Sequence, residues 1–110
     1  MDINFASQQI IKLLQSYADF WGTSHGITRK VLIDEKQHSY QLISMGWYDG
    51  QRYVYNIAFH LEIIDGKIWL QQNNTDILIA DELIENGIPK DKIVLGFIAP
   101  QDRLSTGFAA

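Results

Sequence analysis

The side chains best suited to chemistry in this sequence are its histidines, which number three. His25, His38 and His60 lie far apart, whereas metal-binding and catalytic histidines usually have a second ligand at short spacing, as in H-x-x-x-H. His60 is the most informative of them, because it is predicted to share a strand face with Asn56 and Glu62. A hydrogen-bonded structural or interface histidine is favoured over a general base, since no partner motif accompanies it.

Two tripeptides have the acid-x-Lys form of metal-dependent nucleases, in which carboxylates hold magnesium and the lysine assists the attacking water. Asp65-Gly66-Lys67 stands between two alternating segments, where Asp-Gly is typical of a tight turn, and no Pro-Asp pair precedes it. Asp34-Glu35-Lys36 is typical of a solvated loop. The acidic group Asp81, Glu82 and Glu85 falls on the polar side of a predicted helix. None of the three patterns favours a catalytic site.

Motifs for nucleophiles and phosphates are missing. The sequence contains no G-x-S-x-G, no G-x-G-x-x-G and no P-loop. It has no cysteine, which excludes a thiolate nucleophile, a disulfide and a Cys-based zinc site. We therefore expect a protein that is not an enzyme, with no catalytic residue, metal or cofactor.

Charge argues against unaided nucleic-acid binding. Thirteen acidic side chains outnumber nine basic ones, for a formal charge of −4. DNA- and RNA-binding domains usually present clustered positive charge to the phosphates, and the densest basic group here is Arg29-Lys30 with Lys36 nearby. Nucleic acid is expected to be contacted only indirectly or weakly.

The N-terminus and the apolar runs indicate a cytoplasmic protein. Met1-Asp2-Ile3-Asn4 lacks the basic stretch and apolar run of a signal peptide. The apolar runs are short and interrupted by charged or amide side chains, so no membrane association is expected.

The elements that must position these residues follow from periodicity. Three- and four-residue spacing predicts a helix over 4–21, capped by Asp2 or Asn4, and a second over 76–86, capped by Thr75. Alternation predicts strands at residues 27–33, 39–48, 52–64, 67–72 and 93–97. The predicted fold class is α+β, in the order α-β-β-β-β-α-β, within one domain spanning 1–110. Asp-Gly turns predict an antiparallel meander sheet of about five strands, with the N-terminal helix and the second helix packed on one face.

The segment 52–64 has the clearest alternation in the chain. Its odd-numbered side chains are predicted to point one way and to pack under the helices: Tyr53, Tyr55, Ile57, Phe59, Leu61 and Ile63. The reverse of the sheet then carries Val54, Ala58, His60 and Trp69, a surface resembling a protein interface. A C-terminal segment that covers this surface, with Phe97 and Phe108, is the alternative. The predicted partner-binding face comprises Arg52, Asn56, His60, Glu62 and Trp69.

An ordered set of residues across most of the chain resembles the XisI-like family, named for the fdxN-element excision controlling factor of heterocyst-forming cyanobacteria. The residues that carry the resemblance are Gly46-Trp47, Arg52 with Tyr55, His60-Leu61-Glu62-Ile63, Asp65-Gly66-Lys67-Ile68-Trp69, Ala80 with Leu83, Gly87-Ile88-Pro89-Lys90-Asp91, Ile93-Val94-Leu95-Gly96-Phe97, and Pro100, Arg103, Thr106 and Phe108-Ala109.

The resemblance implies an accessory role in developmentally programmed DNA excision, in which a separate recombinase cuts the strands and a XisH-like protein with a nuclease-like fold is the partner. It implies no catalytic residues. An acidic domain without a site of its own suits a basic, DNA-handling partner. Two alternatives stay open: a regulator that touches DNA through Arg29, Lys30 and Arg52 on one sheet face, and a small-molecule-binding module that uses the His60 and Glu62 face. A homo-oligomer formed through the open sheet face is a further expectation.

Overall fold

The N-terminal helix α1 (Ile3–Trp21) forms because apolar residues recur at three- and four-residue spacing and pack against the sheet. The computed structural model describes residues 1–110. At the start of α1, Asp2 Oδ1 accepts hydrogen bonds from the backbone N–H groups of Asn4 at 2.8 Å and Phe5 at 3.2 Å. The helix ends at Gly22, whose φ is 56°. Of the two predicted caps, Asp2 is therefore the one used.

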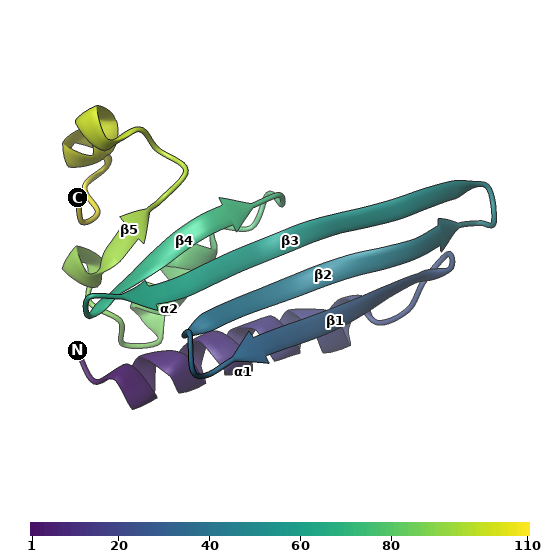
Figure 1. The fold of residues 1–110 in the computed structure, drawn as a ribbon, viewed down its shortest axis with the longest axis horizontal. Coiled ribbons are helices and arrows are strands. Elements are labelled where there is room, and N and C mark those ends of the chain that lie inside the picture. The colour runs from purple at the N-terminus through teal and green to yellow at the C-terminus, as the bar shows by residue number, and fades with distance from the viewer.

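The strands follow the predicted alternation closely and form one sheet in the order β1-β2-β3-β4-β5 (Figure 1). Their bounds are β1 Ile27–Asp34, β2 Ser39–Tyr48, β3 Arg52–Ile64, β4 Lys67–Asn73 and β5 Ile93–Leu95. Short 3₁₀ helices cover Lys90–Lys92 and Pro100–Thr106. Asp65 and Gly66 have φ values of 51° and 75°, the left-handed conformation that a two-residue hairpin turn requires.

The prediction of a fully antiparallel meander is wrong at one strand pair, because β4 and β5 run parallel. Helix α2 (Ile79–Glu85) connects them. Parallel neighbouring strands require a crossover connection of this kind, whereas a two-residue turn joins only antiparallel strands. The predicted last strand, 93–97, is also too long, since a hydrogen bond from Ile98 N–H to Leu95 O turns the chain after Leu95.

Helix α2 is shorter than the predicted 76–86, and Thr75 does not cap it. Asn73 Oδ1 accepts hydrogen bonds from both Thr75 N–H and Thr75 Oγ1, and Asn73 Nδ2 donates to Ile77 O. Thr75 Oγ1 also accepts from Ile77 N–H at 3.0 Å. These local bonds hold the segment in a turn, so the helix begins only after Leu78.

Both helices contribute to one core on a single face of the sheet, as predicted (Figure 1). Tyr17 Oη on α1 donates a hydrogen bond to the Glu82 carboxylate on α2 at 2.6 Å. The buried core comprises Ala6, Ile10, Leu14 and Ala18 of α1, Ile79, Ala80 and Leu83 of α2, Ile88, and the strand residues Tyr40, Leu42, Ala58, Phe59, Leu61, Ile63, Ile68, Leu70 and Ile93. The opposite side of the sheet, away from α1 and α2, is the open face. Its residues include Lys30, Trp47, His60 and Trp69.

No helix of the structure is both long enough and apolar enough to span a bilayer.

Candidate partner-binding face

Strand β3 contains one residue more than β2 over their shared length. Leu42 pairs with Phe59, but the next residue, Ile43, pairs with Ile57, so Ala58 has no partner on β2. A bulge of this kind reverses which side of the sheet the alternating side chains face. The prediction that the odd-numbered side chains of 52–64 all face one way is therefore wrong.

The bulge divides β3 into two halves with opposite orientations. After it, Phe59 and Leu61 face the helices, and both are fully buried. Before it, Tyr53 and Tyr55 lie on the open face with 54% and 60% of their surface exposed. Strand β2 pairs with β1 without a register shift, so its alternation is unbroken and Trp47 lies on the open face beside Tyr53.

Trp47, Tyr53 and Tyr55 form an aromatic patch at the distal end of the β2–β3 hairpin. The ring centroids of Trp47 and Tyr53 are 5.4 Å apart with the planes tilted by 57°, so the two rings are in contact range. Tyr55 pairs across the strands with Met45. Trp47 is 56% exposed, so all three aromatic rings offer a large area to a partner.

The distal hairpin is held in place from the side opposite the patch. Asp49 N–H donates to His25 O at 2.8 Å, and His25 Nδ1 lies 3.1 Å from Asp49 Oδ1. The His25 ring stacks on Tyr48 with centroids 5.1 Å apart. The guanidinium of Arg52 lies 5.6 Å from the centroid of the same Tyr48 ring. The loop after α1 thus supports the strands that carry the patch.

The five residues predicted as a partner-binding face lie on both sides of the sheet. Arg52 and Asn56 precede the bulge and lie on the helix side. His60 and Glu62 follow the bulge and lie on the open face, where Glu62 pairs with Trp69. The predicted shared face of Asn56, His60 and Glu62 is therefore not formed, and the reversal at the bulge is the reason.

His60 and Glu62 both have partners within the chain. His60 Nε2 lies 3.1 Å from Ser39 Oγ on the neighbouring strand. Glu62 Oε1 accepts a hydrogen bond from Gln71 Nε2 at 3.0 Å. The two side chains thus stabilise the polar part of the open face.

The C-terminal segment covers the β4 end of the open face. The guanidinium of Arg103 lies 5.0 Å from the centroid of the Trp69 ring. Arg103 Nε donates to Ile98 O at 3.0 Å, which holds the side chain in place. The predicted cover by Phe97 and Phe108 is not found there, because both residues line a pocket on the helix side.

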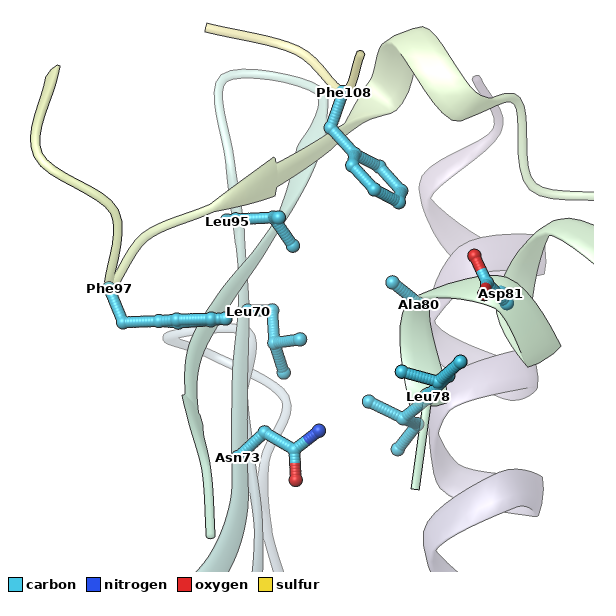
Figure 2. Close-up of a pocket in the computed structure, with 9 residues that line it drawn as sticks. Leu70, Asn73, Leu78, Ala80, Asp81, Leu95, Phe97 and Phe108 are labelled. Atoms are coloured by element: carbon cyan, nitrogen blue, oxygen red, sulfur yellow. The ribbon is translucent and has the colours of Figure 1, made fainter. Parts of the chain in front are cut away.

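That pocket lies between α2, β4, β5 and the C-terminal segment, and has a volume of about 170 Å³ (Figure 2). In Figure 2, Leu70 and Phe108 point into the space between the sheet and α2. Asn73 is engaged with the turn that precedes α2. The lining residues are Leu70, Asn73, Leu78, Ile79, Ala80, Asp81, Leu95, Phe97 and Phe108. An apolar group fits this chemistry, and the lining gives little basis for recognising a polar substrate.

The basic residues proposed for DNA contact do not share one sheet face. Arg29 lies on the helix side, where its Nη1 donates to Ser24 Oγ at 3.2 Å. Lys30 is its neighbour in β1 and therefore lies on the open face. Arg52 lies on the helix side at the distal turn. The predicted grouping of the three is wrong, because adjacent strand residues face opposite ways.

Tyr17 has the one clearly displaced pKa. The pKa of the Tyr17 hydroxyl is raised from 10.0 to about 12, first by burial and then by the hydrogen bond to Glu82 and the negative charge of Glu82. This pair joins the two helices and lies on the helix side of the sheet, away from the aromatic patch. The shift therefore concerns the stability of the fold and not the chemistry of the open face.

The aromatic patch is not among the predicted sites, although the sequence contains a signal for it. The predicted strands 39–48 and 52–64 leave a loop of three residues, Asp49-Gly50-Gln51, and a loop of this length places Tyr53 opposite Trp47. Unbroken alternation places Trp47 on the face away from Leu42, and places Tyr53 on the face of Phe59. Paired residues must share a face, so the two assignments conflict. An inserted residue between Tyr53 and Phe59 resolves the conflict.

Comparison with known proteins places this arrangement among related chains. A family model described as XisI protein matches residues 1–110. The structure is similar to that of a XisI-like protein from Anabaena variabilis ATCC 29413, with 35% identity, 99% of each chain covered and a TM-score of 0.93. It is also similar to the fdxN element excision controlling factor XisI from Anabaena variabilis ATCC 29413, with 32% identity, 97% of this chain and 96% of the other covered, and a TM-score of 0.82. No curated protein matches the chain.

Proposed function

The chain belongs to the XisI family, and we propose that it is a non-catalytic accessory factor in programmed site-specific DNA excision that works by binding a XisH-like protein. A structural relative is an fdxN element excision controlling factor, and the similarity extends over 97% of this chain. The observation that carries the binding proposal is the aromatic patch of Trp47, Tyr53 and Tyr55.

The patch has the properties of an interface centre. Trp and Tyr are the residues most often found to dominate binding energy, because they bury a large area at a small cost in side-chain entropy. Trp47, Tyr53 and Tyr55 are 54–60% exposed, and they stand on two paired strands whose other side is supported by His25 and Tyr48. A partner therefore meets rings whose positions are already fixed, which lowers the entropy lost on binding.

Charge supports a partner that itself handles DNA. The chain has a formal charge of −4, whereas proteins that contact DNA usually carry clustered positive charge. Opposite net charges steer two proteins together and increase the association rate, most strongly at low salt. Direct phosphate binding by this chain is not favoured by the same balance.

The test is co-expression with a XisH-like protein and purification through a tag on one of the two. Co-elution is expected, and the affinity of the purified proteins can be measured by titration calorimetry. Trp47→Ala and Tyr55→Ala are each expected to weaken binding by about tenfold or more, as for residues at an interface centre.

Phe20→Ala is the matched control. Phe20 is an exposed aromatic residue on α1, with 83% of its surface exposed, and it lies outside the patch. It should leave the affinity unchanged. Absence of co-elution at low salt would count against the partner, while equal losses for Phe20→Ala and Trp47→Ala would count against the patch. A gel shift that weakens steeply with salt would instead indicate that the chain itself binds DNA.

A further inference from the structure

The outer edge of β1 carries backbone groups that have no partner in the sheet. Ile27 directs both its N–H and its C=O to Ser24, at 2.9 and 3.1 Å, on the side away from β2. In an antiparallel ladder these directions alternate from residue to residue. The backbone groups of Arg29, Val31 and Ile33 therefore also point outward, and no turn, loop or cap hydrogen bond uses them.

The two edges of the sheet differ in how they are protected. At the other edge, β5 is only three residues long, and Val94 forms a bridge with Ala109 that covers it. Strand β1 is eight residues long, with Leu32 and Ile33 exposed by 47% and 42% on opposite faces. Exposed aliphatic side chains on both faces of an unpaired strand are typical of an edge that accepts another strand.

We propose that a second copy of this chain pairs with β1, antiparallel, about a two-fold axis that passes beside Leu32 and is perpendicular to the sheet. Leu32 then lies opposite Leu32 of the second copy. Val31 and Ile33 exchange both backbone hydrogen bonds with Ile33 and Val31 of the second copy, using the groups that point outward. Lys30 lies opposite Asp34 of the second copy on the open face, at both symmetric positions.

Charge selects this register over its neighbours. A two-fold axis perpendicular to the sheet pairs residues of the same face. Moving the axis by one residue along β1 therefore shifts the partner of each residue by two. An axis beside Lys30 places two lysines opposite each other, which is unfavourable. An axis beside Val31 places Lys30 opposite Leu32 and leaves Asp34 opposite Thr28. The axis beside Leu32 alone pairs opposite charges, so Lys30 discourages incorrect pairing and stabilises the correct one.

The pairing has a geometric consequence for the open face. A two-fold axis perpendicular to the sheet keeps both open faces on the same side, so the two sheets continue into one another. Both aromatic patches then face the same direction. This inference does not depend on the proposed function, because it rests on β1 alone.

The test is sedimentation velocity over a series of protein concentrations. The unmodified chain is expected to reach twice the monomer mass of 12.6 kDa as the concentration rises. Lys30→Asp and Asp34→Lys should each raise the dimer dissociation constant by about tenfold, because each places like charges opposite at both symmetric positions. The double variant Lys30→Asp/Asp34→Lys should restore the original constant. Ile33→Pro should leave a monomer, since proline lacks the outward N–H.

Circular dichroism of each variant shows whether the fold is retained. If Ile33→Pro does not fold, the dissociation constants of the charge variants alone test the pairing through β1. A monomer at every concentration overturns the inference. A dimer that none of the variants weakens also overturns it, since the contact then lies on another surface. Equal weakening in the single and double charge variants overturns the register.

Discussion

The β2–β3 hairpin has two halves with similar aromatic and aliphatic side chains but opposite surroundings. In the proximal half, residues 39–42 and 58–64, the rings of Tyr40 and Phe59 are fully buried beneath α1 and α2. In the distal half, residues 43–48 and 52–57, Trp47 and Tyr55 are more than half exposed. In Figure 1 the distal turn extends beyond the end of α1. Side-chain type alone therefore does not decide which half is core.

The difference arises at one inserted residue. If Ala58 paired with Ile43 in a regular ladder, the alternation of β3 would continue, and Tyr53 and Tyr55 would lie on the helix side with Phe59. The helices do not cover that part of the hairpin, so those rings would gain little burial there. With the bulge, the apolar rings of the distal half gather on the open face beside Trp47. The bulge thus separates a buried half from a half with exposed aromatic rings within one strand.

The largest expected effect tests this separation directly. Phe59→Ala should lower the free energy of unfolding by about 3–5 kcal/mol. Phe59 is fully buried, and its ring lies 5.9 Å from that of Tyr17 and 6.1 Å from that of Trp21. Tyr55→Ala, beyond the bulge, should lower it by less than about 1 kcal/mol, because the ring is 60% exposed. Urea denaturation measures both. Similar losses for the two variants would contradict the division.

The next effect concerns how the distal half is supported. Gly46 has a φ of 141°, and a Cβ at this position would lie 2.1 Å from the carbonyl oxygen of Gly26. Gly46→Ala should therefore destabilise the protein by about 2–4 kcal/mol, through backbone strain together with the clash. Urea denaturation again gives the value.

Gly50→Ala is the control for the contact at Gly46. Gly50 has a φ of 73°, but a Cβ there would meet no atom within 4 Å. Only the cost of placing alanine in the left-handed backbone conformation remains, so the free energy of unfolding should fall by about 1 kcal/mol. If Gly50→Ala were as damaging as Gly46→Ala, the approach of Gly26 would not be what restricts this position.

Most of the fold was predictable from the sequence because its signals are local. Asp-Gly turns and alternation gave the bounds of the strands 39–48 and 52–64 correctly. The errors arose where tertiary structure decides. The direction of β5 depends on the crossover through α2, and the start of α2 depends on the hydrogen bonds of Asn73.

The candidate site was harder to predict because it depends on register between strands. Alternation predicts the face of each residue of β3 from that of its neighbour, and one unpaired residue reverses every prediction beyond it. Alternation alone therefore predicts that Arg52 and Asn56 share a face with His60 and that Tyr53 and Tyr55 belong to the core, and both predictions are wrong. The register set by the loop 49–51 and the alternation along β3 give opposite faces for Tyr53, and only a bulge reconciles them.

The smallest effect tests the link between the helices that cover the proximal half. The Tyr17 hydroxyl donates to Glu82 at 2.6 Å, and burial with this bond raises its pKa from 10.0 to about 12. The protonated phenol is the form that the fold favours, so its contribution to stability is complete below pH 10 and is lost as the pH rises towards 12. Tyr17→Phe should cost about 1 kcal/mol at pH 7 and show a smaller loss of stability between pH 9 and pH 11 than the unmodified chain. Urea midpoints at those pH values measure the difference. The affinity of Tyr17→Phe for the partner should be unchanged, because Tyr17 lies on the side away from the aromatic patch. An identical pH dependence of stability in both proteins would show that this bond does not stabilise the fold.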